Sequence, residues 1–184
     1  MAEDRRIRYT KASLKSSLLE LLHQKPLSKV SVKELCELAD VNRGTFYAHY
    51  KSPEVLMSSI EDEFMAGLVN HLKNQSGTDS PLEINTKVLE FIMANKSLCQ
   101  IILSRRENDS DLRDAIASLY EQFAPIWLGE MSGTAEGEYV FTFIVSGSVG
   151  MIRDWLNSPN PASPKAMAAL MQELVQNGLG FLKK

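Results

Sequence analysis

Apolar residues recur every three or four positions along most of the chain, in segments separated by short polar breaks. This spacing is typical of amphipathic α-helices that bury one face. The pattern predicts an all-α fold of about nine helices. The expected helices span residues 10–23, 32–39, 43–50, 53–74, 81–94, 98–103, 112–128 (with a kink at Pro125), 138–156, and from 164 onward.

The stretch from residue 31 to residue 56 carries the most detailed local signals. Ser31 is a good helix N-cap, and Glu34 three residues later completes the pattern of a capping box. Asp40 interrupts the apolar stripe of this helix, and Asn42 is a good cap for the next one. These signals predict two short helices joined by a tight turn.

The second of these helices is expected to bury one side and expose the other. Phe46 and Tyr50 are four residues apart, so both can face the first helix. The residues turned outward or to the flanks are then Arg43, Gly44, Thr45, Tyr47, Ala48 and His49. This is helix-turn-helix architecture, in which the second helix reads bases in the major groove. The alternative is a helical hairpin whose polar face is simply solvated.

The exposed side chains suit two kinds of DNA contact. Arg43 can fork onto a guanine, and Thr45 can bond a base or touch a thymine methyl group. The short side chains of Gly44 and Ala48 let the backbone come close. Phosphate contacts, which position the helix without reading sequence, are expected from Tyr47, His49 and Lys51.

The segment VNRGTFYAHYKSPEVL, residues 41–56, resembles the N-terminal signature of the TetR/AcrR family of one-component bacterial regulators. The resemblance implies an all-helical dimer with a small DNA-binding domain and a larger ligand-binding, dimerising domain. It also implies a phosphate contact for Thr10. The expected DNA-contacting residues are therefore Thr10, Ser31, Asn42, Arg43, Gly44, Thr45, Tyr47, Ala48, His49 and Lys51.

Two positions depart from the family pattern. Asp40 stands in the turn where the family usually has glycine, and aspartate tolerates left-handed backbone better than most residues. Pro53 stands where the family usually has a lysine, which looks like a phosphate contact in relatives. Lys51 and the first amides of the helix capped by Ser52 can replace that lysine, because helix N-termini attract phosphate.

The net charge of −3 is unevenly distributed. Residues 1–53 contain ten Lys/Arg and six Asp/Glu, a net charge of +4, whereas residues 54–184 carry −7. A basic head on an acidic body fits local DNA contact, and we expect these two segments to be the DNA-binding and ligand-binding domains. Arg5, Arg6 and Arg8 precede the first helix as a basic arm. This arm either contacts the minor groove or the backbone of DNA, or it is a frayed terminus.

The last two helices predict a dimer. Residues 138–156 are apolar nearly all round, so this helix must be covered on every side. The segment IVSGSVGMIRDWL followed by SPKAMAALM is similar to the C-terminal domain common in TetR-type regulators of Firmicutes, which implies a four-helix bundle between two subunits. The alternative is a core helix within a monomer. The expected interface comprises Phe143, Ser146, Gly147, Gly150, Met167, Leu170, Met171 and Leu174.

Aromatic and methionine side chains of the body either line a ligand cavity or form plain core. The candidates are Phe64, Phe91, Tyr120, Phe123, Trp127, Met151 and Trp155. Few polar groups occur among them, so a small apolar or aromatic effector is preferred. Alternatively, the body binds another protein.

Other functional classes find little support. The histidines, His23, His49 and His71, are scattered without metal-ligand spacing, and no nucleophile elbow, P-loop or dinucleotide fingerprint occurs. We therefore expect neither an enzyme nor a cofactor or metal. Cys36 and Cys99 lie in apolar stretches and are expected to be buried thiols in a reducing cytosol. No signal peptide is expected, which favours a cytoplasmic protein.

These features together predict a mechanism. A homodimer would place two recognition helices on a palindromic operator. An effector in the body would tilt the helix at 53–74 and lower the affinity for DNA. Bound protein would exclude polymerase, so repression is expected. The alternative is a co-regulator that acts mainly through protein–protein contact and binds little or no DNA itself.

Overall fold

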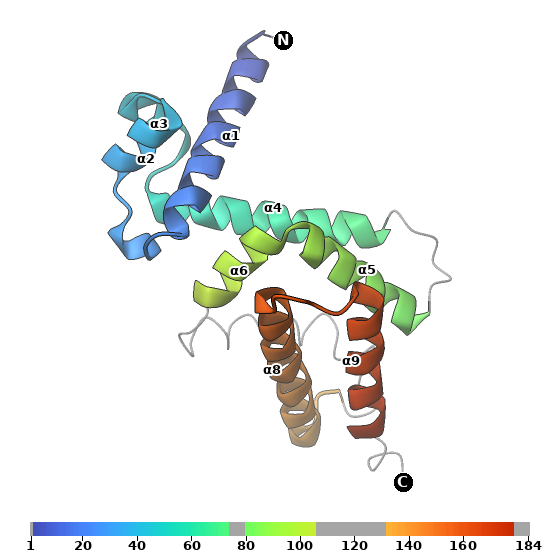
Figure 1. The fold of residues 1–184 in the computed structure, drawn as a ribbon. Coiled ribbons are helices and arrows are strands. Elements are labelled where there is room, and N and C mark those ends of the chain that lie inside the picture. Colours follow the sequence, from blue (N-terminus) through green and yellow to red (C-terminus); the bar gives the residue numbers. More distant parts are fainter. Residues whose placement is uncertain (1, 74–79, 106–131, 179–184) are drawn as a thin grey trace. The chain divides into compact units, whose positions relative to one another are not determined.

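A computed structural model describes residues 2–73, 80–105 and 132–178. Within these ranges the chain forms eight α-helices and one short 3-10 helix and no strand, which confirms the all-α prediction (Figure 1). The expected helix at 112–128, with Pro125, Tyr120, Phe123 and Trp127, lies outside the described residues. None of the described helices is long and apolar enough to cross a membrane.

The chain divides by contacts into two compact units, residues 1–71 and 72–184. The helix α4 therefore groups with the first unit along nearly its whole length, although it begins at residue 53. The functional boundary expected after residue 53 stays a prediction.

The first unit contains α1 (Ala2–Leu22), the 3-10 helix η1 (Leu27–Lys29), α2 (Val32–Ala39), α3 (Arg43–His49) and α4 (Pro53–Lys73). Its core is built from the apolar stripes of these helices, and α1 packs on α2, which packs on α3. The residues with no exposed side-chain surface are Leu14, Leu18, Leu35, Phe46, Leu56 and Met57. Polar contacts also join its helices: Ser13 Oγ donates to the Ala39 carbonyl at 2.8 Å, and Lys15 pairs with Glu63.

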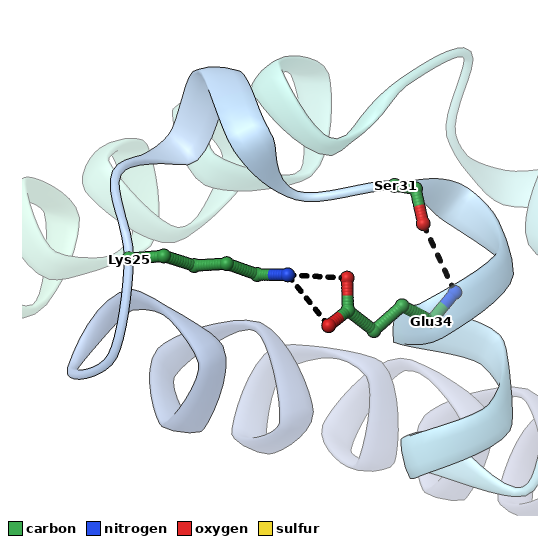
Figure 2. A network of polar contacts seen from close by, with 3 residues as sticks. All are labelled: Lys25, Ser31 and Glu34. Carbon is green, nitrogen blue, oxygen red and sulfur yellow. Dashed lines mark hydrogen bonds and ion pairs between the residues drawn. The ribbon is translucent and has the colours of Figure 1, made fainter.

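One predicted cap of the first unit is only half present. The Ser31 Oγ accepts a hydrogen bond from the Glu34 N–H at 3.3 Å, as expected. The Glu34 carboxylate, however, does not return to the Ser31 backbone and instead binds the Lys25 ammonium with both oxygens (Figure 2). Lys25 lies in the connector after α1, and its ammonium replaces the Ser31 N–H as the partner of Glu34 because charge-assisted hydrogen bonds are stronger than neutral ones. The pair ties the connector to α2.

The start of α1 also differs from the prediction. The helix begins at Ala2 rather than near residue 10, so Arg5, Arg6 and Arg8 lie on a helix and not on an irregular arm. Thr10 is consequently a half-buried residue inside the helix and not its cap. Alanine and arginine have high helix propensity, and this lets the helix extend without an apolar stripe to mark it.

The second unit contains α5 (Pro81–Ala94), α6 (Lys96–Arg105), α8 (Ala135–Asn157) and α9 (Pro164–Gly178). Helix α5 packs on α9, and α6 packs on α8. Hydrogen bonds fasten α6 to α8. Gln100 Nε2 donates to the Leu156 carbonyl at 3.1 Å and to Asn157 Oδ1 at 2.9 Å, and Arg153 Nη2 donates to the Leu103 carbonyl at 3.2 Å.

The caps of the second unit explain its helix boundaries. Ser80 and Glu83 form the predicted capping box at the start of α5, and the Ser163 Oγ accepts from the Ala166 N–H at 3.2 Å at the start of α9. The hydrogen bonds from Ser80 lower the pKa of the Glu83 carboxyl. Helix α8 begins three residues before the expected residue 138, because Thr134 caps it through the Gly137 N–H at 3.0 Å.

Candidate nucleic-acid interface

The turn between α2 and α3 is built around a left-handed aspartate. Asp40 has φ 52° and ψ 45°, and among the described residues it alone, apart from glycine, has a positive φ. The Val41 N–H donates to the Cys36 carbonyl at 3.0 Å, and the Asp40 N–H donates to the Glu37 carbonyl at 3.4 Å. This is the Schellman arrangement, which satisfies the last carbonyls of a helix. The expectation that aspartate replaces the usual glycine here is confirmed.

Helix α3 begins at a tight local cap. The Asn42 Oδ1 accepts a hydrogen bond from the Gly44 N–H at 2.7 Å. A Cβ atom at Gly44 would lie 3.3 Å from that oxygen, closer than ordinary van der Waals contact. Glycine therefore leaves room for the cap. The sequence alone suggested a different reason for Gly44, namely that it lets the helix backbone come close to DNA.

Two aromatic residues anchor α3 to the rest of the first unit. Phe46 is fully buried and Tyr50 is 6% exposed, with ring centroids 6.0 Å apart, as their spacing predicted. The Tyr47 ring stands nearly perpendicular to the Phe46 ring, with centroids 5.5 Å apart, but Tyr47 remains 58% exposed. The anchored side fixes which residues of α3 face outward.

The outward face of α3 contains most of the predicted contact residues. Those exposed are Asn42, Arg43, Gly44, Thr45, Tyr47, Ala48 and, just after the helix, Lys51. His49 is half-buried and lies 6.4 Å from Tyr50 between ring centroids. Ser31 is exposed at the start of α2, where its hydroxyl oxygen serves as the cap. DNA contact by these residues, and by Thr10 on α1, stays a prediction.

A shallow groove of about 400 Å³ runs beside the turn and ends at the first residue of α3. Its lining residues are Lys33, Cys36, Glu37, Asp40, Val41, Asn42 and Arg43. Burial raises the pKa of the Cys36 thiol, and the nearby Arg43 guanidinium partly offsets this effect. Cys36 therefore stays a protonated, apolar filler under the turn, in line with its predicted role.

The residues proposed for a ligand cavity are spread over both units. Phe64 is a half-buried residue of the first unit, whereas Phe91 and Met151 are half-buried residues of the second. Trp155 is 3% exposed, and its indole N–H donates to the Ala162 carbonyl at 2.7 Å. Trp155 thus holds the loop between α8 and α9, a structural role that the sequence reading missed. The cavity itself stays a prediction.

Helix α8 has one covered face and one open face. Phe141, Val145 and Trp155 are buried, whereas Tyr139 and Phe143 on the opposite side are 77% and 78% exposed. Apart from the neighbouring residues and the backbone of α8 itself, no atom of the described chain would lie within 4 Å of a Cβ at Gly147 or Gly150. On α9, Leu170 and Leu174 are also about half exposed, at 48% and 53%. The described chain therefore covers one side of α8 only, and the expectation that a second subunit covers the other side stays a prediction.

Comparison with known proteins places this architecture in a family. Residues 16–60 match the family described as bacterial regulatory proteins, tetR family, and residues 79–177, more than half of the chain, match the transcriptional regulator C-terminal region of TetR-type proteins. The chain belongs to the TetR family of transcriptional regulators. The first match spans α2 and α3 with the turn between them, so the helix-turn-helix prediction is confirmed.

Individual relatives of this TetR-family chain are distant. It is 24% identical over 176 residues to the uncharacterized HTH-type transcriptional regulator YxbF of Bacillus subtilis (strain 168), covering 89% of this chain. The match spans only 44% of the length of that relative.

The similar solved structures establish the fold. A TetR transcriptional regulator from Streptococcus agalactiae 2603V has a TM-score of 0.70 at 24% identity, covering 95% of this chain and 98% of the other. A TerR/AcrR-family regulator from Aquifex aeolicus VF5 has a TM-score of 0.61 at 20% identity, covering 94% and 99%. The dihydroxyacetone kinase operon activator DhaS has a TM-score of 0.59 at 14% identity, covering 94% and 97%.

Proposed function

We propose that this TetR-family regulator is a sequence-specific DNA-binding repressor, acting as a homodimer on a palindromic operator and releasing DNA when an effector binds its body. The single observation that carries the proposal is the outward face of α3. Small, polar and aromatic side chains project from a helix that Phe46 and Tyr50 hold in place. A rigid, exposed helix of this kind fits a DNA major groove.

The exposed face divides into base-reading and backbone-positioning residues. Arg43 and Thr45 stand in the first turn of α3, where helix-turn-helix proteins contact base edges. Tyr47 and Lys51 are suited to phosphate oxygens. A co-regulator that does not contact DNA does not need base-reading and phosphate-binding side chains on the same helix face. Their presence together therefore supports the DNA-binding alternative.

The open face of α8 supports the homodimer. Two exposed aromatic side chains, Tyr139 and Phe143, lie on the same side as Gly147 and Gly150, whose lack of a side chain serves no packing purpose within the described chain. Small residues on a helix surface permit close approach of another helix. We therefore assign this face, with Leu170 and Leu174 of α9, to a second copy of the chain.

The regulatory step relies on α4. This helix starts directly after the recognition segment and ends at Lys73, two residues past the contact boundary at residue 71, so it leads from the DNA-binding head toward the body. We propose that the effector binds one arrangement of α4 more tightly and that DNA binds the other. The effector then lowers the affinity for DNA by the free energy that couples the two sites. We keep a small apolar or aromatic effector as the proposed class.

The test is a selection of duplexes from a random library with the full chain, followed by mobility-shift titration of the selected site. Arg43→Ala should lose about 1–3 kcal/mol of discrimination at one base position. Lys51→Ala should weaken all sequences similarly, and Tyr47→Ala should weaken binding to the selected site. Ile84→Ala, an exposed position on α5, is the matched control and should change nothing.

Unchanged operator binding by a folded Tyr47→Ala variant would show that α3 is not the recognition helix. If the selection enriches no sequence at all, the co-regulator alternative replaces the present proposal.

A further inference from the structure

The first two turns of α1 form a basic extension of the DNA-binding head. They carry Arg5, Arg6 and Arg8, all exposed, on a continuous helix that begins at Ala2. Three lysines of the same unit are already engaged with glutamates, in the pairs Lys15–Glu63, Lys25–Glu34 and Lys33–Glu37. No ion pair found among the described residues includes the three arginines. Exposed guanidinium groups of this kind can bind an anionic partner.

A single hydrogen bond fixes how α1 is rotated about its axis. Ser13 Oγ donates to the carbonyl of Ala39, the last residue of α2, so this face of α1 points toward the α2–α3 turn. Residues three and seven positions earlier lie on the same face of a helix. Those residues are Thr10 and Arg6.

Arg8 provides a contrast on the same helix. At 3.6 residues per turn, it is rotated by about 160° from Arg6, so it points away from the α2–α3 turn. With a rise of about 1.5 Å per residue, Arg6 lies about 10 Å along the axis from Ser13. Figure 1 shows this end of α1 extending past α3 within the first unit.

We propose that Arg6, in line with Thr10, contacts the DNA phosphate backbone beside the groove that α3 enters. The inference rests on the proposed function, because it extends the same interface to a second element. Its occupant is duplex DNA, for which the guanidinium is well matched, since it can bind a phosphate through two parallel N–H groups. The contact adds affinity but no base discrimination.

The experiment compares three full-length variants on the duplex obtained from the selection described above. Equilibrium binding is measured by fluorescence anisotropy over a range of salt concentrations, and the slope of log K against log salt counts the phosphates neutralised. Arg6→Ala should reduce the magnitude of that slope by about 0.9 for each protomer bound. Arg6→Lys, which keeps the charge, should retain the slope.

Arg8→Ala is the matched control, because it removes the same charge from the same helix on the opposite side. Alanine is the best helix former, so neither substitution unwinds α1. The proposal predicts a slope near wild type for Arg8→Ala and an unchanged ranking of base substitutions in the site for Arg6→Ala.

Either of two results would overturn the contact of Arg6 and leave the proposed function intact. The first is an equal slope for Arg6→Ala and wild type, and the second is an equal reduction of the slope for Arg6→Ala and Arg8→Ala. The second result would mean a diffuse electrostatic effect of the extension. If the wild-type chain binds neither the selected duplex nor random duplex, the proposed function fails, and the contact of Arg6 fails with it.

Discussion

At the scale of single residues, Asp40 sets the angle between α2 and α3. Its left-handed backbone costs an ordinary L-residue about 1–2 kcal/mol, whereas glycine and, to a lesser degree, aspartate and asparagine adopt it readily. The position needs a residue that accepts φ 52° and leaves the two backbone hydrogen bonds of the turn intact. A β-branched side chain is the least compatible with that geometry.

We expect Asp40→Val to destabilise the helix-turn-helix by about 1–2 kcal/mol and Asp40→Gly to leave it near wild type. Amide hydrogen exchange over residues 32–50 measures this local stability directly. Glu37→Val, on the exposed side of α2 where the backbone is helical, is the control. Equal protection in Asp40→Val and Glu37→Val would mean that the turn is not strained.

Cys99 gives a second prediction at this scale. The thiol is 4% exposed on α6, and burial raises its pKa from 9.0 to about 12. An unfolded chain ionises this thiol near its ordinary value, whereas the folded chain keeps it protonated. The stability that this difference contributes is fully present below pH 9 and is lost as the pH rises toward 12.

Replacement of Cys99 by alanine should therefore cost less at alkaline pH than at neutral pH. Urea unfolding followed by tryptophan fluorescence reports on the second unit, to which Trp127 and Trp155 belong. Ile102→Val, at a buried position on the same helix, should cost the same amount at every pH. A pH-independent cost for Cys99→Ala would contradict the shifted pKa.

At the scale of elements, helix boundaries were predictable where a local signal marks them. Ser80 with Glu83, Asn42, and Ser52 followed by Pro53 act through neighbours within four residues, and the helices start where these caps predict. The start of α1 was missed because no apolar stripe precedes Leu14. The partner of Glu34 was missed because Lys25 reaches it only through the fold.

The faces of α8 illustrate a different limit. Apolar composition predicts that a helix is covered, but a sequence does not say whether its own chain or another copy provides the cover. In the structure Phe141 is fully buried and Phe143 is 78% exposed, although they are two residues apart on the same apolar helix. The sequence therefore yields candidate interface residues such as Phe143, but which side of α8 the chain itself covers is known only from the structure.

We expect Phe143→Glu to convert the proposed homodimer into monomers. A carboxylate on the open face of α8 would have to lose its water on association without gaining a partner, which is unfavourable. Sedimentation equilibrium should show a dimer dissociation constant raised at least tenfold, about 1.4 kcal/mol. Ile84→Glu places the same charge at an exposed apolar position of α5 and should leave association unchanged. Unaltered association of Phe143→Glu would remove α8 from the interface.

At the scale of the whole molecule, the proposed function depends on pairing two basic heads. One head offers a short recognition helix of seven residues, and the chain as a whole carries a net charge of −3. A single head therefore offers few base contacts, while the acidic body opposes binding. A dimer doubles the contacts and fixes the distance between the two recognition helices, which makes binding sensitive to the spacing of half-sites.

This argument predicts a periodic response to insertions at the centre of the selected palindrome. An insertion of about five base pairs turns one half-site to the opposite side of the duplex, whereas about ten base pairs restores its direction at a greater distance. Wild-type binding in mobility-shift titrations should fall strongly with the first insertion. Phe143→Glu should bind weakly to all three duplexes, because separate heads do not sense spacing. If wild type binds the five-base-pair insertion as tightly as the original site, each head acts independently and the dimer has no part in operator recognition.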